Sequence, residues 1–185
     1  MVFDTMDVSS YLINDLQGLP ATVTEVDYLK RGYHLEVLLR PDQVREFAEI
    51  LRGYQFYLVF VSAVHLQPYI EITYQFASFS QPLRLVGRSP ATTDGTIPSI
   101  ADIFNGANWH ERETRDMFGV IFSGHPYLEP LLLAEEDADL RPLLKQEGSL
   151  KPEDAVRWLP QGAIKDAITA QHAATTVPGK KPVPK

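Results

Sequence analysis

Residues 56–86 read FYLVFVSAVHLQPYIEITYQFASFSQPLRLV, and this stretch decides the fold class. Its first part, Phe56–Leu66, is apolar at nearly every position, which is typical of a central strand that is covered on both faces. Apolar and polar residues then alternate along Tyr69–Ala77, as in a half-buried antiparallel strand. A turn at Ser78–Gln81 leads into Leu83–Val86. We expect three strands of one sheet, connected by short turns.

The residues before this stretch add a hairpin and two helices. Val8–Leu16 is weakly helical, whereas Ala21–Leu29 and Tyr33–Leu39 have the patterns of two strands separated by a turn. Pro41 begins a second helix and Gly53 ends it. Its apolar residues share one face: Val44, Phe47, Ala48 and Leu51. A mixed or antiparallel sheet with packed helices indicates an α+β fold, followed by an extended C-terminal segment.

Length and composition predict one domain. The chain has 185 residues and is 44% hydrophobic, which is enough for a single core. We place this domain at residues 1–146, and expect residues 147–176 to be an extended segment that wraps a partner. Residues 177–185 contain three prolines and three lysines and predict a disordered tail.

Charge and cysteine content limit the function. A net charge of −7 argues against nucleic acid and anionic membranes as direct partners, because both attract clustered Lys and Arg. The chain contains no cysteine, which removes disulfides, thiolate nucleophiles and Fe–S ligation. The N-terminus shows neither a signal peptide nor a membrane span. We therefore expect a soluble protein on the cytoplasmic side, held at any membrane by other subunits.

Residues 98–126, PSIADIFNGANWHERETRDMFGVIFSGHP, differ in character from the sheet region. Ser99 is placed to cap a short helix that Asn105-Gly106 interrupts. Asn108 is placed to cap a second helix, with Glu111 three residues later in a capping-box position. Gly119 ends this second helix.

The second helix carries charge inside its apolar face. Projection at 100° per residue places Glu113 between Trp109 and Met117. A carboxylate buried there without a partner would cost several kcal/mol. Two pairs lie at i,i+4 spacing, Arg112 with Asp116 and Glu111 with Arg115. The plainer interpretation is a solvated surface helix, whose ion pairs contribute about 0.3–0.5 kcal/mol each.

The run GANWHERETRDMFG at 106–119, followed by GHP at 124–126 and LLL at 131–133, resembles the signature of the C-type subunit of respiratory complex I. Related subunits occur in energy-converting hydrogenases. The resemblance covers residues 21–145 and agrees with the α+β pattern.

The resemblance implies a subunit without a flavin, cluster, metal or catalytic residue of its own. Such subunits lie in the peripheral arm of an ion-translocating NADH:quinone oxidoreductase, against the quinone-site subunit that resembles the hydrogenase large subunit. Iron–sulfur clusters and quinone are then bound by neighbouring subunits, some of which span the membrane. The implied fold-locking or interface residues are Trp109, Glu111, Arg112, Glu113, Asp116, Met117, Phe118, Gly119, Gly124, His125 and Pro126.

One departure leaves the type of complex open. Residues 142–146 read PLLKQ, where relatives usually read PLRKD, so one cation and one carboxylate are missing. The equivalent subunit of a membrane-bound NiFe hydrogenase, or of a ferredoxin- or F420-linked complex, therefore remains an alternative.

A second class of function is a small metal-dependent hydrolase that uses His110, Glu113 and His125. The run lacks HExxH because Thr114 occupies the place of the second histidine. For each histidine, including His65, a structural hydrogen bond is the simpler interpretation.

A nucleotide-binding module is not supported either. Gly87-Arg88 and Gly179-Lys180 lie outside any Gly-rich phosphate loop. A general adaptor protein fits the composition, and only the motif run argues against it.

Overall fold

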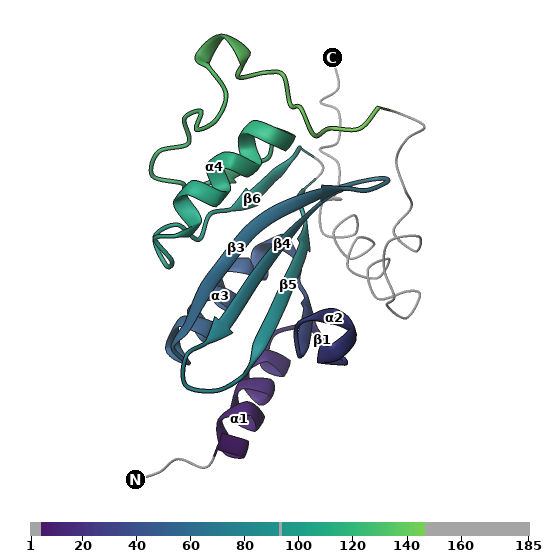
Figure 1. Ribbon diagram of the computed structural model, residues 1–185, viewed down its shortest axis with the longest axis vertical. Coiled ribbons are helices and arrows are strands. Elements are labelled where there is room, and N and C mark those ends of the chain that lie inside the picture. The colour runs from purple at the N-terminus through teal and green to yellow at the C-terminus, as the bar shows by residue number, and fades with distance from the viewer. Residues whose placement is uncertain (1–4, 93, 147–185) are drawn as a thin grey trace, which may run out of the picture.

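The computed structural model describes residues 5–92 and 94–146, which form helices packed on a mixed sheet (Figure 1). The helices are α1 (Thr5–Gly18), α2 (Tyr28–Arg31), α3 (Val44–Gly53) and α4 (Ala107–Phe118), with 3-10 turns η1 (Pro41–Gln43) and η2 (Glu135–Asp137). The strands are β1 (Thr22–Glu25), β2 (Leu35–Leu38), β3 (Phe56–His65), β4 (Ile70–Ser78), β5 (Arg84–Pro90), β6 (Thr96–Pro98) and β7 (Ile121–Ser123). The predicted α+β class is confirmed.

Five strands form the main sheet, in the order β1-β2-β5-β4-β3. The β2–β5 pair is parallel, and the other three pairs are antiparallel. In Figure 1, α3 lies behind this sheet and α1 lies at its lower end. One face of the sheet therefore carries the main core.

The core forms where α3 approaches the middle strands closely. A Cβ atom on Gly87 would lie 2.5 Å from the Phe47 ring, so this position of β5 requires glycine. Phe47 packs edge-on against Phe76 at a centroid distance of 5.7 Å, and Phe104 packs on Phe76 at 5.1 Å. These rings join α3, β4 and the segment before α4 into one core.

The prediction that Phe56–Leu66 is a central strand is wrong. β3 lies at the edge of the sheet, whereas β5 occupies its centre. Apolar residues on both faces do not determine the number of hydrogen-bonded neighbours, and they do not ensure full burial either, because Val59 of β3 is exposed. Here α4 packs against β3 and shields part of its apolar surface, although β4 is the one strand that pairs with β3 in the described sheet.

Two boundaries in the first half also differ from the predictions. Strand β1 ends at Glu25, and Tyr28 begins the helical turn α2, because the Asp27 carboxylate accepts a hydrogen bond from the Leu29 N–H at 3.0 Å. Gly53 is the last residue of α3 and not its cap. The β1–β2 hairpin and the apolar face of α3 are confirmed.

A small parallel pair, β6 with β7, brackets α4 and was not predicted. Its register places Pro98 beside Ser123, so the segments before and after α4 lie side by side. The predictions for residues 147–176 and 177–185 lie outside the described residues. Within the described part of the chain, no helix is both long and apolar enough to cross a membrane.

Candidate functional site

Helix α4 turns a different face inward from the one that was predicted. Its buried residues follow a spacing of three to four: Ala107, Glu111, Thr114 and Phe118, together with Asp116. Trp109 is 67% exposed and Glu113 is exposed as well. The carboxylates inside the protein are therefore Glu111 and Asp116. The apolar face projected around Glu113, between Trp109 and Met117, is not the buried face of the helix, and the exposure of Glu113 agrees with the plainer interpretation of a solvated surface.

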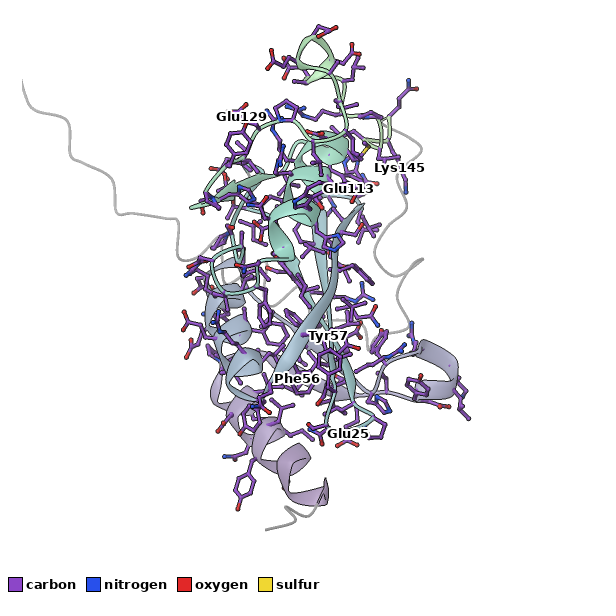
Figure 2. All side chains as sticks on the ribbon, turned by 60° about the vertical axis from the view of Figure 1, so that its left-hand side comes forward. Glu25, Phe56, Tyr57, Glu113, Glu129 and Lys145 are labelled. Carbon is purple, nitrogen blue, oxygen red and sulfur yellow. The ribbon has the colours of Figure 1, made fainter. Side chains whose placement is uncertain are left out.

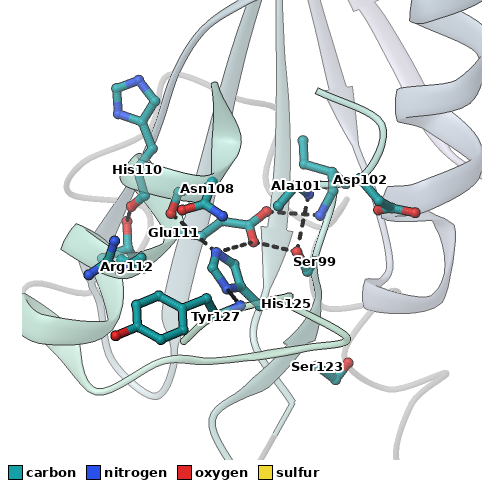
Figure 3. Close-up of polar contacts among 12 residues, drawn as sticks. Ser99, Ala101, Asp102, Asn108, His110, Glu111, Arg112, Ser123, His125 and Tyr127 are labelled. Atoms are coloured by element: carbon teal, nitrogen blue, oxygen red, sulfur yellow. Dashed lines mark hydrogen bonds and ion pairs between the residues drawn. The ribbon is translucent and has the colours of Figure 1, made fainter. Parts of the chain in front are cut away.

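Glu111 connects α4 to the segment that precedes it (Figure 3). Its Oε2 accepts a hydrogen bond from the Ser99 hydroxyl at 2.5 Å, and its Oε1 accepts one from the Ile100 N–H at 2.8 Å. The predicted capping box is wrong, because Gly106 is the N-cap residue and makes no side-chain cap bond. Ser99 does act as a cap, since its hydroxyl oxygen accepts from the Ala101 N–H at 3.1 Å, but the segment that it caps is a turn and not the predicted short helix.

Burial dominates the electrostatics of Glu111. It raises the pKa of this carboxyl from 4.5 to about 7, although the bonds from Ser99 and Ile100 oppose the shift. The Tyr74 hydroxyl is fully buried and has no hydrogen-bond partner among the described residues. Burial, and secondarily the charge of Glu111, raises the pKa of Tyr74 well above its usual value. This region of the core is therefore apolar enough to disfavour charge.

His125 connects the start of α4 to the segment that follows β7. Its Nε2 lies 3.2 Å from the Asn108 carbonyl oxygen, and its Nδ1 accepts from the Tyr127 N–H at 3.0 Å. This pattern requires the neutral tautomer with the proton on Nε2. Burial lowers the pKa of His125, which agrees with a neutral ring 3.9 Å from Glu111.

Asp116 fixes the Leu131–Leu133 segment. Its Oδ2 accepts three backbone N–H bonds, from Leu131 and Leu132 at 2.8 Å and from Leu133 at 3.2 Å. Burial alone would raise the pKa of Asp116, but these three donors and Arg115 outweigh it and lower that pKa. The carboxylate therefore stays charged and serves as the hydrogen-bond acceptor for the backbone N–H groups of this segment.

Arg112 binds the chain just upstream of that segment. Its guanidinium donates to the Glu129 carbonyl at 3.0 Å and to the Pro130 carbonyl at 2.8 Å. It also lies over the Tyr127 ring, 5.1 Å from the centroid. The predicted Arg112–Asp116 pair does not form between these side chains, and neither does Glu111–Arg115, because each group has nearer partners.

The other predicted residues divide between core, backbone and surface. Phe118 lies in the core, and Gly119 ends α4 with φ 78°, as predicted. Gly124 has φ 80° and turns the chain toward His125. Met117 is half-buried, and its carbonyl accepts from the Leu143 N–H at 3.0 Å. Pro126 is exposed.

Two charge clusters were missed by sequence reasoning. Arg45 of α3 donates twice to the Asp102 carboxylate, at 2.8 Å each, and once to the Ser99 carbonyl at 2.7 Å. On the opposite face of the sheet, Arg88 contacts two buried carboxylates, Glu36 at 2.6 Å and Glu71 at 3.1 Å. Their partners lie 17 to 57 residues apart in sequence, so local spacing carried no signal of either cluster.

The geometry does not favour a metal site at the predicted histidines. Figure 3 shows His110 pointing away from His125, and both ring nitrogens of His125 contact backbone groups. Across residues 5–92 and 94–146, no three potential His, Asp or Glu ligands converge. His65 accepts from the Lys145 N–H at 3.1 Å, which confirms a structural hydrogen bond.

Fold and site together define an α+β domain in which one charged helix holds the segments on both sides of it. The family model for the respiratory-chain NADH dehydrogenase 30 kDa subunit matches residues 37–152. The chain belongs to this family, which confirms the resemblance inferred from residues 106–119.

Two relatives illustrate the range of the family. The C-type subunit of the NADH-quinone oxidoreductase of Roseiflexus castenholzii is 37% identical over 112 residues, covering 55% of this chain and 63% of the relative. The C-type subunit of the F(420)H(2) dehydrogenase of Methanosarcina mazei is 31% identical over 140 residues, covering 72% and 88%. The match therefore spans less than two thirds of the Roseiflexus protein.

Two solved structures share the fold. The trypsin-resistant fragment (1-134) of Nqo5 superposes with a TM-score of 0.55 at 21% identity, covering 65% of this chain and 99% of the fragment. A chain of an archaeal respiratory membrane complex, the membrane-bound sulfane sulfur reductase, gives a TM-score of 0.62 at 23% identity. That match covers 72% of this chain and 82% of the other.

Proposed function

We propose that this chain is a non-catalytic subunit in the peripheral arm of a membrane-bound, ion-translocating NADH:quinone oxidoreductase, where it supports the quinone-site subunit. Family membership supports the proposal. The observation on which it chiefly rests is the arrangement of three polar side chains of α4. Glu111, Arg112 and Asp116 all bind segments of their own chain. These three side chains therefore hold a surface in shape and are not presented to a substrate.

The outward face of α4 is the proposed docking surface. Trp109 and Glu113 are exposed, and Glu113 has no hydrogen bond or ion pair among the described residues. Exposed tryptophan is typical of interface hot spots. We infer that these two side chains contact the subunit resembling the hydrogenase large subunit, and that Gly124–Pro126 shapes the adjoining surface.

Cofactors follow from the same proposal. Iron–sulfur clusters and quinone would be bound by neighbouring subunits, because this chain has no cysteine to supply thiolate ligands. Its place would be the cytoplasmic side of the membrane, where iron–sulfur and membrane-spanning subunits hold it.

An F420-linked complex is the second candidate. The Methanosarcina mazei protein matches 72% of this chain, against 55% for the Roseiflexus protein. The sequence and fold are therefore compatible with a different electron donor for the same type of subunit.

We further propose that the folded domain ends near residue 146 and that residues 147–176 wrap a partner, followed by a free tail. The last described contacts, Leu143 on Met117 and Lys145 on His65, hold the chain to the domain up to this point. The related Nqo5 fragment is trypsin-resistant. Trypsin should therefore cut the isolated chain after residue 146 and leave the domain intact, and cleavage there should slow in the complex. Equal cleavage rates in both states would reject the wrapping segment.

Purification of the tagged full chain from gently solubilised membranes tests the function. Mass spectrometry should identify iron–sulfur and antiporter-like subunits in the same preparation. A flavin-containing input module would indicate NADH as donor, whereas an F420-oxidising module would indicate the second candidate. A monomeric chain that carries a metal would overturn both.

A further inference from the structure

Strand β3 lies at one edge of the described sheet, and the protection that its lower half carries is an irregular ladder between Leu58 and Phe60. Its neighbour in the described sheet is β4 alone, so alternate N–H and C=O groups of β3 point away from the sheet. Exposed edges usually carry charged residues or proline, which prevent pairing with other strands. Residues 56–64 read FYLVFVSAV and contain neither. Such an edge can pair with an added strand wherever no helix or loop covers it.

Helix α4 covers one half of this strand. Figure 2 shows α4 alongside the upper part of β3, while Phe56 and Tyr57 lie below the helix. Side chains from both halves reach the core, namely those of Phe56, Val61 and Ala63, so the difference between the halves concerns the edge of the strand. In the lower half the ladder with β4 is irregular between Leu58 and Phe60. The uncovered part of the edge is therefore residues 56–60.

Exposed apolar side chains surround this uncovered part. Val59 is 40% exposed, and Phe79 at the β4–β5 turn is 85% exposed. The Phe79 ring stacks on Tyr57 at a centroid distance of 4.1 Å, which holds it in place beside the strand. We call Tyr57, Val59, Phe60 and Phe79 the β3 edge patch. It combines free main-chain groups with an apolar border.

We propose that an extended, uncharged strand of a neighbouring subunit adds to β3 along residues 56–60. The absence of charge in 56–64 argues for an apolar occupant, because a charged strand would find no counterpart there. Main-chain hydrogen bonds would hold the strand, and Tyr57 and Phe79 would pack on its side chains. The inference rests on the proposed function, since it needs a partner from the same complex, and it adds a contact separate from the α4 surface.

The irregular ladder also argues against a second copy of this chain as the occupant. A two-fold pair of β3 strands would bring two irregular stretches, each at 58–60, into one ladder. Each irregular stretch would leave main-chain groups without hydrogen-bond partners. A regular strand from another protein would pair with only one irregular stretch.

Amide hydrogen exchange on the isolated full chain and on the assembled complex tests this inference. We expect alternate amides within residues 56–60 to exchange about tenfold or more slowly in the complex than in the isolated monomer. Equal protection in the monomer would mean that another segment of the same chain covers the edge, and would overturn the proposal. Protection that depends on self-association of the isolated chain would also overturn it.

Substitution of Val59 separates this inference from the proposed function. V59K adds a charge to the edge, and L29K adds the same charge to α2, where Leu29 is 92% exposed. Recovery of partner subunits should fall about tenfold for V59K and remain at the wild-type level for L29K. Thermal melting of both variants must match wild type. If V59K melts at a lower temperature than wild type, V59T serves as the second variant. The deciding measurement is then whether the slow amide exchange of residues 56–60 in the complex is lost in the variant.

These experiments distinguish a failure of the strand addition from a failure of the proposed function. If the wild-type chain recovers no partner subunits, the proposed function is wrong. If wild type, V59K and L29K all recover the same amount and exchange at 56–60 is unchanged by assembly, only the strand addition is wrong.

Discussion

The Ser99 hydroxyl donates a 2.5 Å hydrogen bond to the Glu111 carboxylate, across twelve residues of chain. Ser99 directly follows β6, and Glu111 lies on the buried face of α4. The bond therefore sets the angle at which α4 leaves the small β6–β7 pair. Trp109 lies on the exposed side of the same helix, so we expect the buried carboxylate to help to position the proposed docking surface.

Glu111 makes stability depend on pH. Its pKa rises from 4.5 to about 7 on folding, so the folded protein retains a proton that the unfolded chain releases in this interval. Stability should therefore fall as pH rises from 4.5 to 7, by up to about 3 kcal/mol. E111Q should lose this contribution while keeping the shape of the side chain. Urea unfolding of both proteins between about pH 5 and 8 measures the difference.

The control is internal, because other titrating groups affect both proteins equally. The free energy of unfolding of wild type minus that of E111Q should decrease with pH and level off above about pH 7. A difference that stays constant, or that increases with pH, would show that Glu111 is ionised throughout.

Asp116→Asn should release the Leu131–Leu133 segment. The variant can still present its amide oxygen to the three N–H donors, but it loses the negative charge, and its NH2 group then faces the Arg115 guanidinium. We expect a loss of about 2–3 kcal/mol in the free energy of unfolding. Amide exchange at residues 131–133 should accelerate at the same time. D137N, an exposed change in η2, should stay within about 0.5 kcal/mol of wild type, and equal effects of the two would contradict the assignment.

Arg88→Met should destabilise the sheet face opposite α3. It removes the cation that Glu36 and Glu71 both contact, and loss of one partner from a buried ionic cluster costs about 3–5 kcal/mol. The matched control is R84M, because Arg84 is an exposed residue on the same face of β5. Chemical unfolding measures both. Similar losses for R88M and R84M would show that the cluster contributes little.

Trp109→Ala and Glu113→Gln should weaken assembly without changing the fold. Both side chains are exposed on α4, so thermal unfolding should remain close to wild type, while recovery of partner subunits should fall about tenfold for W109A. Tyr11→Ala and Glu46→Gln are matched controls on α1 and α3, and Figure 1 shows α1 at the opposite end of the molecule from α4. Normal complex yield together with lost turnover in E113Q would argue for a chemical role and against the docking surface.

Local sequence patterns correctly predicted those elements that depend on interactions between residues close together in the sequence. The apolar face of α3, the antiparallel pairing of β4, the cap at Ser99 and the end of α4 at Gly119 were all predicted. Each depends on neighbours within a few residues, and such interactions are visible in the sequence. The predicted half-burial of β4 is wrong, because Glu71 and Thr73 on its polar face are buried as well. The run at 106–119 likewise indicated the family.

The sequence by itself determined the α+β class, the helical motif and its family. Only the tertiary structure decided that β3 lies at the edge, that Glu111 and Asp116 face inward, and that Glu113 faces outward. The physical reason is that a buried carboxylate is stabilised by whichever donors the fold brings to it. For Glu111 and Asp116 the hydroxyl and backbone N–H donors lie 11 to 17 residues away, beyond the reach of helical periodicity.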